Sequence, residues 1–180
     1  MTSPLRFTAA LLALLSVSGA SHILRAQAMK AAAPASDAAD RKDILALEDR
    51  YNDGFNTRNI NEIMSCYAPG KALFVFDAIP PREYPSWDAF KRDFETLFST
   101  YPGPVSNSIS NMSITVVGPV AYGHNIQSAT LTAKDGTKTQ VVVRVTDVYR
   151  KLNGKWLIVL EHVSFPVDVA TGKADLLSQP

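Results

Sequence analysis

Two aspartates stand in strongly apolar surroundings, where a carboxyl group can do acid–base chemistry. Asp147 interrupts a run rich in β-branched residues, and Asp77 ends a short apolar run. A carboxylate can take a proton, whereas a carboxyl group that an apolar pocket keeps protonated can donate a hydrogen bond. Both residues also have structural interpretations. Asp77 fits a turn residue that binds its own backbone, and Asp147 fits a paired residue or one on a solvated face.

Three further side chains have a functional and a structural interpretation. Tyr51 recurs with apolar residues on one helical face, so it is either a donor in a pocket or a core aromatic. Trp87 opens a predicted helix, where it either roofs a pocket or packs in the core. His124 lies in the predicted strand 120–133, where it is either structural or a hydrogen-bonding wall of a pocket. The elements that carry these residues decide which of them can meet.

Apolar spacing predicts three helices in the first half of the mature chain. The three apolar stripes are Ile44, Leu47, Tyr51 and Phe55; Ile60, Ile63, Met64 and Tyr67; and Trp87, Phe90, Phe94, Leu97 and Phe98. Their three- and four-residue steps place each set on one helical face. Residues 57–59 separate the first two helices, and Pro69-Gly70 ends the second. Ser86 caps the third helix, which the Pro-containing segment 101–104 terminates.

Strands dominate the second half. After a short strand at 72–77, the four runs with strand periodicity are 105–117, 120–133, 138–150 and 155–165. The short turns between these four runs predict an antiparallel meander. Helices first and strands afterwards indicate an α+β fold. A curled sheet with three helices on its concave side leaves a pocket between the two layers.

The turn at Asn153-Gly154 decides which side chains of the last strand share a face with Asp147. A two-residue type I′ turn pairs Leu152 with Lys155, and His162 then joins the face of Asp147. The alternative is a three-residue loop that includes Leu152 and has Gly154 in the left-handed conformation.

That loop pairs Lys151 with Lys155. Asp147 then shares its face with Glu161, because a one-residue slip exchanges the two faces of a strand.

The N-terminus is typical of a secretory signal peptide. Arg6 supplies a positive charge, 7–20 is an almost unbroken apolar run, and small residues follow at spacings that a signal peptidase accepts. The sequence predicts a signal peptide at 1–28, a linker at 29–36, one domain at 37–168 and a C-terminal tail at 169–180. The protein is therefore expected in the periplasm or secreted, with no membrane attachment after cleavage.

Composition argues against several functional classes. The formal net charge is +1, and no basic run favours a nucleic-acid partner. Cys66 is the only cysteine, so no internal disulfide forms, and its helical setting fits a buried small residue. The sequence lacks the common motifs for metals, nucleotides and covalent nucleophiles. We therefore expect neither a metal nor a cofactor.

Two segments resemble a known family. Residues 144–166 are similar to the last hairpin of SnoaL-like proteins of the NTF2-like superfamily, and Tyr67-Ala68, Asp77 and Ser86-Trp87-Asp88-Ala89-Phe90 resemble the segment before its sheet. The resemblance covers about residues 40–168. It implies an α+β, NTF2-like cone with three N-terminal helices packed on a curved, mostly antiparallel β-sheet. Because one fold hosts many functions, it says less about chemistry.

Three polar positions resemble ketosteroid isomerase more closely. Tyr51 and Tyr67-Ala68 keep that family's interval, Asp77 ends the first strand, and Val145-Thr146-Asp147-Val148 is similar to a strand that carries a second aspartate. The resemblance implies proton abstraction next to a carbonyl, with Asp77 as base and with Tyr51 and a protonated Asp147 as donors to the enolate oxygen. This would be a cofactor-free isomerase or lyase. The alternatives are a non-catalytic periplasmic binding protein and a homo-oligomeric assembly module.

The same resemblance implies the rest of the pocket and a partner. We expect a small-molecule ligand to contact His124, Trp87, Tyr67 and either Glu161 or His162. His124 departs from the apolar wall of the isomerases, so the expected ligand is more polar than a steroid. The resemblance favours the register that turns Glu161 inward. In that register the outer face carries Arg144, Thr146, Trp156, Ile158 and His162, a mixed surface that suits a homodimer interface.

Overall fold

Three helices precede the main strands. The computed structural model describes residues 34–178, and the elements below belong to the unit that runs from Ser36 onward. The helices are α2 (Pro34–Thr57), α3 (Ile60–Met64) and α4 (Trp87–Thr100), close to the predicted positions. α2 begins inside the predicted linker, and the predicted signal peptide lies outside the described residues.

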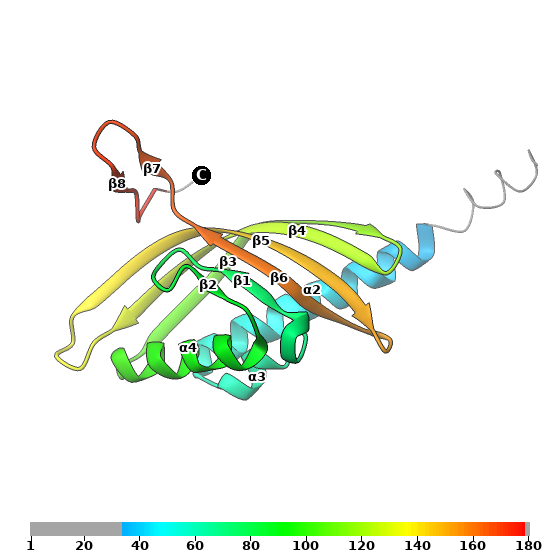
Figure 1. Ribbon diagram of the computed structural model, residues 1–180, viewed down its shortest axis with the longest axis horizontal. Coiled ribbons are helices and arrows are strands. Elements are labelled where there is room, and N and C mark those ends of the chain that lie inside the picture. The colour runs from blue at the N-terminus through cyan, green and yellow to red at the C-terminus, as the bar shows by residue number, and fades with distance from the viewer. Residues whose placement is uncertain (1–33, 179–180) are drawn as a thin grey trace, which may run out of the picture. The chain divides into compact units, whose positions relative to one another are not determined.

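A curved sheet of six strands forms the second layer (Figure 1). The strands are β1 (Phe74–Phe76), β2 (Glu83–Tyr84), β3 (Val105–Val117), β4 (Val120–Thr132), β5 (Lys138–Leu152) and β6 (Lys155–Ser164). Their order is β2-β1-β6-β5-β4-β3, and only the β1–β6 pair is parallel. The expectation of three helices on a curved, mostly antiparallel sheet is confirmed. A short 3₁₀ helix, η1 (Gly70–Ala72), leads into β1.

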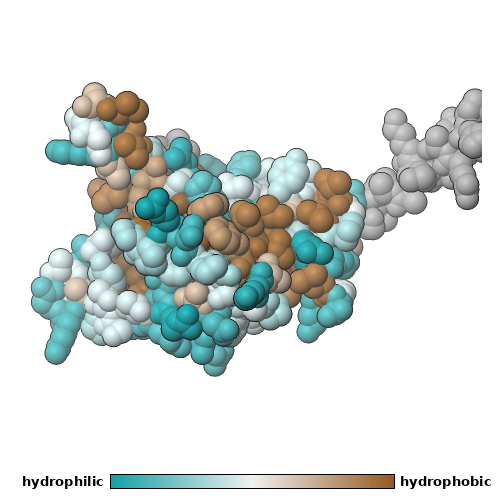
Figure 2. Space-filling model, viewed as in Figure 1, coloured by the Kyte–Doolittle hydropathy of each residue, from teal (hydrophilic) through white to brown (hydrophobic). Residues whose placement is uncertain are grey.

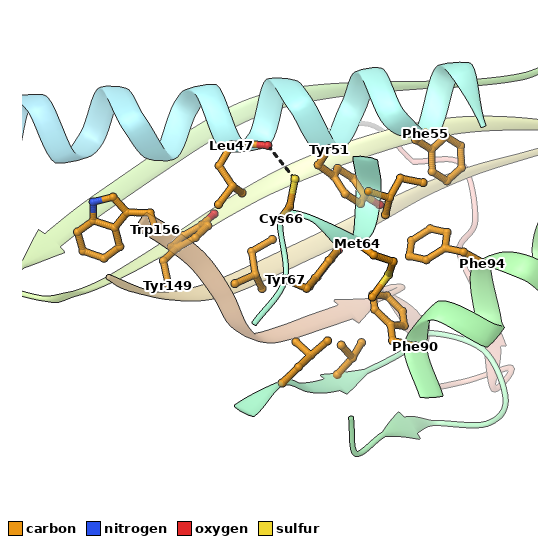
Figure 3. Close-up of a cluster of buried hydrophobic side chains, with 14 of the residues drawn as sticks. Leu47, Tyr51, Phe55, Met64, Cys66, Tyr67, Phe90, Phe94, Tyr149 and Trp156 are labelled. Atoms are coloured by element: carbon orange, nitrogen blue, oxygen red, sulfur yellow. Dashed lines mark hydrogen bonds between the residues drawn. The ribbon is translucent and has the colours of Figure 1, made fainter. Parts of the chain in front are cut away.

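The core lies between the helices and the concave face of the sheet. Figure 3 shows apolar side chains of α2, α4 and the strands meeting there. The predicted helical stripes supply most of this core: Ile44, Leu47, Tyr51, Phe55, Ile63, Met64, Phe90, Phe94 and Phe98 are all buried. Cys66 is also buried, and its thiol approaches the carbonyl oxygen of Leu47 at 3.5 Å. The stripes therefore place the helices on one face of the sheet.

Arg58 fixes the corner between α2 and α3 against the end of α4. Its φ of 59° allows the chain to reverse there. The guanidinium donates to the carbonyl oxygens of Phe98, Tyr101 and Gly103 at 2.5, 2.8 and 2.6 Å. Carbonyls at the end of a helix lack partners within the helix, so these bonds hold α4 in place along one side of the cavity described below.

The β5–β6 hairpin combines features of both predicted registers. Asn153 and Gly154 have φ values of 51° and 80°, as a two-residue type I′ turn requires, and Leu152 pairs with Lys155. A bulge on β6 then inserts one extra residue, because Tyr149 pairs with Ile158 but Val148 pairs with Leu160. Beyond the bulge the two faces of β6 are exchanged.

The bulge corrects the predicted outer face. Trp156 and Ile158, expected on the outside, are 4% and 1% exposed and belong to the core. Glu161 comes after the bulge and shares the face of Asp147, as expected, but it reaches that face through the bulge and not through a three-residue turn, and it lies directly opposite Asp147. Before residue 159 the even-numbered residues of β6 therefore point inward, and after it the odd-numbered residues do.

The C-terminal tail is ordered into a small hairpin of β7 (Val167–Asp168) and β8 (Lys173–Ala174). After it, the carbonyl oxygen of Leu176 accepts a hydrogen bond from the Val142 amide at 2.7 Å. This bond attaches the tail to β5 beyond the last residue that pairs with β6. Among residues 34–178, no helix combines the length and apolar composition that a membrane crossing requires.

Candidate functional site

A cavity of about 350 Å³ lies between the sheet and the helices. α2, α4, the loop after β1 and strands β3 to β6 all contribute to its walls, and Leu176 of the tail contributes as well. The apolar lining comes mainly from Phe55, Ile79, Phe90, Phe94, Leu97, Tyr101, Ala129, Leu131, Val141, Val143, Val145, Val163 and Phe165. The polar lining comes from Tyr51, Asp77, Asp93, Asn107, Gln127, Thr139 and Glu161. Within the described range 34–178, no lysine, arginine or histidine lines the cavity.

Asp77 reaches the cavity from the end of β1. Its Oδ1 accepts a hydrogen bond from the Ala78 amide at 2.6 Å, and its own amide donates to the carbonyl oxygen of Arg82 at 2.9 Å. The predicted turn role and the pocket role therefore coexist. Burial raises the pKa of Asp77 to about 6, with a smaller upward contribution from the nearby Asp93 carboxylate. Near neutral pH the group is mostly ionised and is a moderate base.

Tyr51 projects from α2 into the same cavity (Figure 3). Its ring packs edge-on against Tyr67, with centroids 6.2 Å apart, and only 7% of the residue is exposed. Among the described residues, its hydroxyl has no hydrogen-bond partner, so it is free to donate to a ligand. Burial and the surrounding carboxylates, Glu161 first among them, raise the pKa of Tyr51 well above its usual range. It remains a phenol near neutral pH.

Glu161 completes the polar end of the cavity. Its Oε2 accepts a hydrogen bond from the Tyr67 hydroxyl at 2.7 Å, and the residue is 4% exposed. Burial raises the pKa of Glu161 to about 8, against the opposing effect of the Tyr67 hydrogen bond. The group therefore holds a proton near neutral pH. Tyr51, Asp77 and Glu161 thus place a free phenol, an ionised carboxylate and a protonated carboxyl group on one cavity.

Asp147 does not line the cavity, which corrects the prediction that it is a donor there. Its side chain is 1% exposed and lies directly opposite Glu161 on the neighbouring strand, and Glu161 takes the cavity-facing position. The Asp147 Oδ2 is 3.4 Å from the Tyr149 hydroxyl and 3.5 Å from the Asn125 Nδ2. Burial raises the pKa of Asp147 well above its ordinary value, and the Glu161 charge adds to the shift. The direction of this shift favours a protonated Asp147, at a position away from the cavity.

Tyr67 and Trp87 support the cavity without lining it. Tyr67 is buried behind Glu161 and orients it through the hydrogen bond from its hydroxyl. Trp87 donates from its indole Nε1 to the carbonyl oxygen of Met64 at 2.8 Å, which joins the start of α4 to the end of α3. The position of Trp87 therefore favours a structural role over a role as the roof of the pocket.

His124 and His162 lie on the outer face of the sheet, which corrects the expectation that either contacts a ligand in the cavity. Both are exposed and absent from the cavity lining. Strand alternation explains their position, because the neighbours Asn125 and Glu161 are 2% and 4% exposed and point inward. His162 packs against Phe76, with ring centroids 5.7 Å apart.

Three buried polar residues were not predicted from the sequence, although the position of one of them, Glu48, carries a signal. Glu48 lies between Ile44 and Tyr51 at helical spacing, on the apolar face of α2, and is 4% exposed. A carboxylate on such a stripe marks a buried acid. Asn125 and Gln127 alternate with outward residues on β4, but their inward direction depends on register. Among the described residues, no group of three or more His, Cys, Asp or Glu side chains is placed to hold a metal ion.

Comparisons with known proteins place this arrangement in a family. The model for the family described as calcium/calmodulin dependent protein kinase II association domain matches residues 40–166. No curated protein matches the chain in sequence.

Solved structures show the same fold. An NTF2-like protein of unknown function from Pseudomonas putida KT2440 is 25% identical, covers 79% of this chain and 98% of its own, and has a TM-score of 0.71. A candidate calcium/calmodulin dependent protein kinase II association domain from Xanthomonas campestris is 27% identical, covers 67% and 84%, and has a TM-score of 0.58. A candidate scytalone dehydratase from Novosphingobium aromaticivorans is 15% identical, covers 79% and 95%, and has a TM-score of 0.63. At that identity, the last match speaks for the fold alone.

Proposed function

The chain belongs to the calcium/calmodulin dependent protein kinase II association domain family and has the NTF2-like fold, and from this premise we propose that it is a cofactor-free enzyme for proton abstraction next to a carbonyl. The observation that carries the proposal is the convergence of Tyr51, Asp77 and Glu161 on one mostly apolar cavity. The reaction would be an isomerisation or an elimination.

Asp77 acts as the general base in this proposal. A base works best when its pKa lies near the working pH, and the pKa of Asp77 is raised to about 6. The Ala78 amide holds Oδ1 at 2.6 Å, which leaves Oδ2 to approach a C–H bond of the ligand. The proton moves from the carbon next to the carbonyl to Asp77, and the electron pair of that C–H bond forms the enolate.

Tyr51 and Glu161 stabilise the enolate oxygen. Both groups keep their protons near neutral pH, because burial raises the pKa of each. Hydrogen-bond donors that are already oriented toward a developing negative charge stabilise the transition state more than the ground state. Glu161 therefore takes the role that the sequence assigned to Asp147.

The cavity favours an uncharged ligand. Its polar lining includes the carboxyl groups of Asp77, Asp93 and Glu161, and no basic side chain from the described part of the chain offsets them. A carboxylate or phosphate on the ligand would lose its hydration without gaining a partner cation. The remaining lining is mainly aliphatic and aromatic. We therefore propose a small, largely apolar ketone in place of the more polar ligand that a cavity-lining His124 would have implied.

The test follows exchange of C–H protons in a panel of uncharged cyclic ketones, with β-tetralone as the first member. The purified protein is incubated with each ketone in deuterated water, and loss of the proton next to the carbonyl is followed by NMR. We expect catalysed exchange that Asp77→Asn reduces about 10²- to 10⁴-fold, the usual contribution of a general base. Asp88→Asn, in the first turn of α4 and exposed, is the matched control and should exchange at the wild-type rate.

Two outcomes would contradict the proposal that the protein is an enzyme with Asp77 as its general base. One is exchange by folded Asp77→Asn at the wild-type rate. The other is the absence of catalysed exchange for every ketone in the panel while β-naphthol, a phenol that mimics the enolate, binds in the cavity. The second outcome would make the protein a non-catalytic ligand-binding protein.

Homo-oligomeric assembly is the second candidate function, and exposed aromatic side chains favour it. Phe76 and Tyr122 are 41% and 53% exposed on the outer face of the sheet. Figure 2 shows apolar side chains gathered among polar ones over the region of β1 and β6. Light scattering after gel filtration should give a dimer or larger for the wild type and a smaller species for Phe76→Ser with Tyr122→Ser. A monomeric wild type at all accessible concentrations would exclude this candidate.

Export remains part of the proposal, supported by the apolar run 7–20 and the small residues after it. Expression with the full N-terminus in a bacterial host should release a shortened protein into the periplasm or medium. Terminal sequencing should place its first residue near 21 or 29. Retention of Met1 on the secreted or cytosolic protein would contradict the signal-peptide interpretation.

A further inference from the structure

A cluster of three acidic residues lies behind the cavity wall without a cation. Glu48 of α2, Asp147 of β5 and Glu161 of β6 are 4%, 1% and 4% exposed. Among the described residues, the two ion pairs involve other groups, Lys91 with Glu95 and Lys151 with Asp40. Three ionised carboxylates without a partner cation would be very costly at this depth. The cluster must therefore hold protons.

Hydrogen bonds through Tyr149 and the pairing of β5 with β6 bring the three carboxyl groups into one chain. The Tyr149 hydroxyl donates to the Glu48 Oε1 at 2.7 Å and lies 3.4 Å from the Asp147 Oδ2. Asp147 lies directly opposite Glu161 on the neighbouring strand, so the two carboxyl groups are on the same face of the sheet. Tyr67 donates to the far oxygen of Glu161 at 2.7 Å. The chain thus runs from Glu48 through Tyr149 and Asp147 to Glu161.

An unpartnered oxygen indicates where a proton is shared. The Oδ1 of Asp147 is fully buried and has no donor among the described residues. Its Oδ2 already lies near Asn125 and Tyr149. A proton between Asp147 and Glu161 would satisfy this remaining oxygen, because one carboxyl group would then donate to the other.

The strand β4 leaves room for this chain at Gly123. A Cβ at that position would come within 3.2 Å of the Tyr149 hydroxyl and 2.9 Å of the Ser113 carbonyl oxygen. Gly123 also lies directly opposite Asp147 on β5. The glycine therefore lets the Tyr149 hydroxyl sit between Asp147 and Glu48. Of the three acids, only Glu161 lines the cavity.

We propose that Glu48, Asp147 and Glu161 form one buried proton store that opens on the cavity at Glu161, with Asp147 and Glu48 as positioning residues. The inference deepens the proposed function and rests on it for its use. When a ligand oxygen becomes basic, the Glu161 O–H bond breaks and an O–H bond forms on the ligand. Asp147 then passes its proton to Glu161, and the negative charge rests on Asp147, near Asn125 and Tyr149. The steps reverse when the ligand releases the proton.

The groups around Glu161 agree with this assignment. The titratable side chains that face it are Tyr67, Glu48, Asp77, Asp147 and, from α2, Tyr51. All are acids, so each proton that stays in the cluster relieves repulsion among the rest. Burial raises the pKa of Glu48 to about 7, and mutual repulsion adds to the upward shift at Asp147 and Glu161.

The experiment is an NMR titration of the wild-type protein with isotope-labelled carboxyl carbons, assigned by Glu48→Gln, Asp147→Asn and Glu161→Gln. Groups that share protons titrate in common macroscopic steps. We expect the Glu161 and Glu48 signals to show the same two midpoints, although the two residues lie on different elements. Tyr149→Phe should abolish the common midpoints. Glu95→Gln, an exposed change on α4, should leave them unchanged.

A second measurement tests whether the proton store is connected to the cavity through Glu161. Saturating β-naphthol should shift the titration of Glu48 by about one pH unit, a substantial change in coupling, although Glu48 does not line the cavity. A single independent midpoint for each wild-type carboxyl group would overturn the proton store. A β-naphthol effect confined to Glu161 would overturn its connection to the cavity.

The readouts separate this inference from the proposed function. The titration uses no turnover, so common midpoints stand even if no ketone exchanges its protons. Conversely, ketone exchange with independent midpoints would leave Asp77 as base and remove the store. Because the wild-type titration decides the main point, a variant that fails to fold does not leave the question open.

Discussion

The inner face of the sheet is filled at one end and hollow at the other, although β5 and β6 build both ends. At the filled end Tyr149, Trp156 and Ile158 are at most 4% exposed and pack under α2. At the hollow end the same strands present Val143, Val145 and Val163 to the cavity. Aromatic side chains span the space between the layers, whereas valines leave it open. The acid cluster lies at the boundary between the two ends.

The bulge at Val159 makes this division possible. Without it, the register of the type I′ turn would place Glu161 and Trp156 on opposite faces of β6. With it, Trp156 fills the core before the bulge and Glu161 reaches the cavity after it. One inserted residue thus allows a strand to serve a packed core and a polar cavity on the same side of the sheet.

The largest expected effect comes from emptying the filled end. Trp156→Ala should lower the free energy of unfolding by about 3–5 kcal/mol, because it removes a buried aromatic side chain and leaves a void. It also removes the hydrogen bond from the indole Nε1 to the Asp40 Oδ1 at 3.0 Å. Equilibrium unfolding in urea measures the loss.

Val143→Ala is the matched change at the hollow end. Its methyl groups already border the cavity, so we expect the free energy of unfolding to fall by about 1 kcal/mol. That value is close to the cost of transferring the removed groups to water, without an added cost for a new void. Similar losses for Val143→Ala and Trp156→Ala would show that the two ends pack alike and would remove the contrast.

The acid cluster should make stability fall as pH rises. Burial raises the pKa of Glu161 from 4.5 to about 8 and that of Glu48 to about 7. The folded chain therefore holds protons that the unfolded chain has released, and stability decreases between about pH 4.5 and pH 8. We expect the fall to be on the order of a few kcal/mol. Urea unfolding at successive pH values measures it.

Glu161→Gln should remove the share of that dependence that comes from Glu161, because the amide stays neutral at every pH, and the slope should become shallower. Glu95→Gln, at an exposed position on α4, should leave the slope as in the wild type. Stability that rises steadily from pH 5 to pH 8 would contradict raised carboxyl pKa values in the folded protein.

The fold was predictable because its signals are local. Helical stripes such as Ile44 to Phe55 and the turns at Gly118-Pro119 and Asn153-Gly154 each specify an element from neighbouring residues alone. The order of those elements then indicates one layer of helices on a meander. The five predicted strands agree with β1 and β3 to β6 within two residues at each end, whereas the short strands β2, β7 and β8 were not predicted.

The site was less predictable because side-chain direction depends on register. Tyr51 and Asp77 follow from position on an element, and both line the cavity. Glu161, and not Asp147, lines the cavity, and this depends on the bulge at Val159. No residue type in this segment predicts the bulge. The family resemblance implied a pocket position for His124, but strand alternation turns its side chain outward.

Filling the hollow end should cost binding more than stability. Val143→Phe places an aromatic ring in the cavity, and we expect the affinity for β-naphthol to fall at least about tenfold, equivalent to about 1.4 kcal/mol. The free energy of unfolding should change less, because the ring occupies existing space. Fluorescence titration and urea unfolding measure the two quantities. Val120→Phe, exposed at the start of β4, is the control, and equal loss of affinity in both variants would place the binding site elsewhere.

The smallest expected effect separates the two faces of a single strand. His124→Ala lies on the outer face of β4 and should leave β-naphthol affinity within about twofold, as for other surface changes. Gln127→Leu lies three residues on, inside the cavity, where the Gln127 Oε1 accepts from the Asn107 Nδ2 at 3.2 Å. The Gln127 Nε2 has no partner among the described residues, so its loss should weaken a ligand that uses it about fivefold to tenfold. Fluorescence titration of the pair compares them directly. A loss of affinity in His124→Ala that exceeds the loss in Gln127→Leu would mean that ligands bind on the outer face of the sheet, and the hollow end would then be only a packing defect.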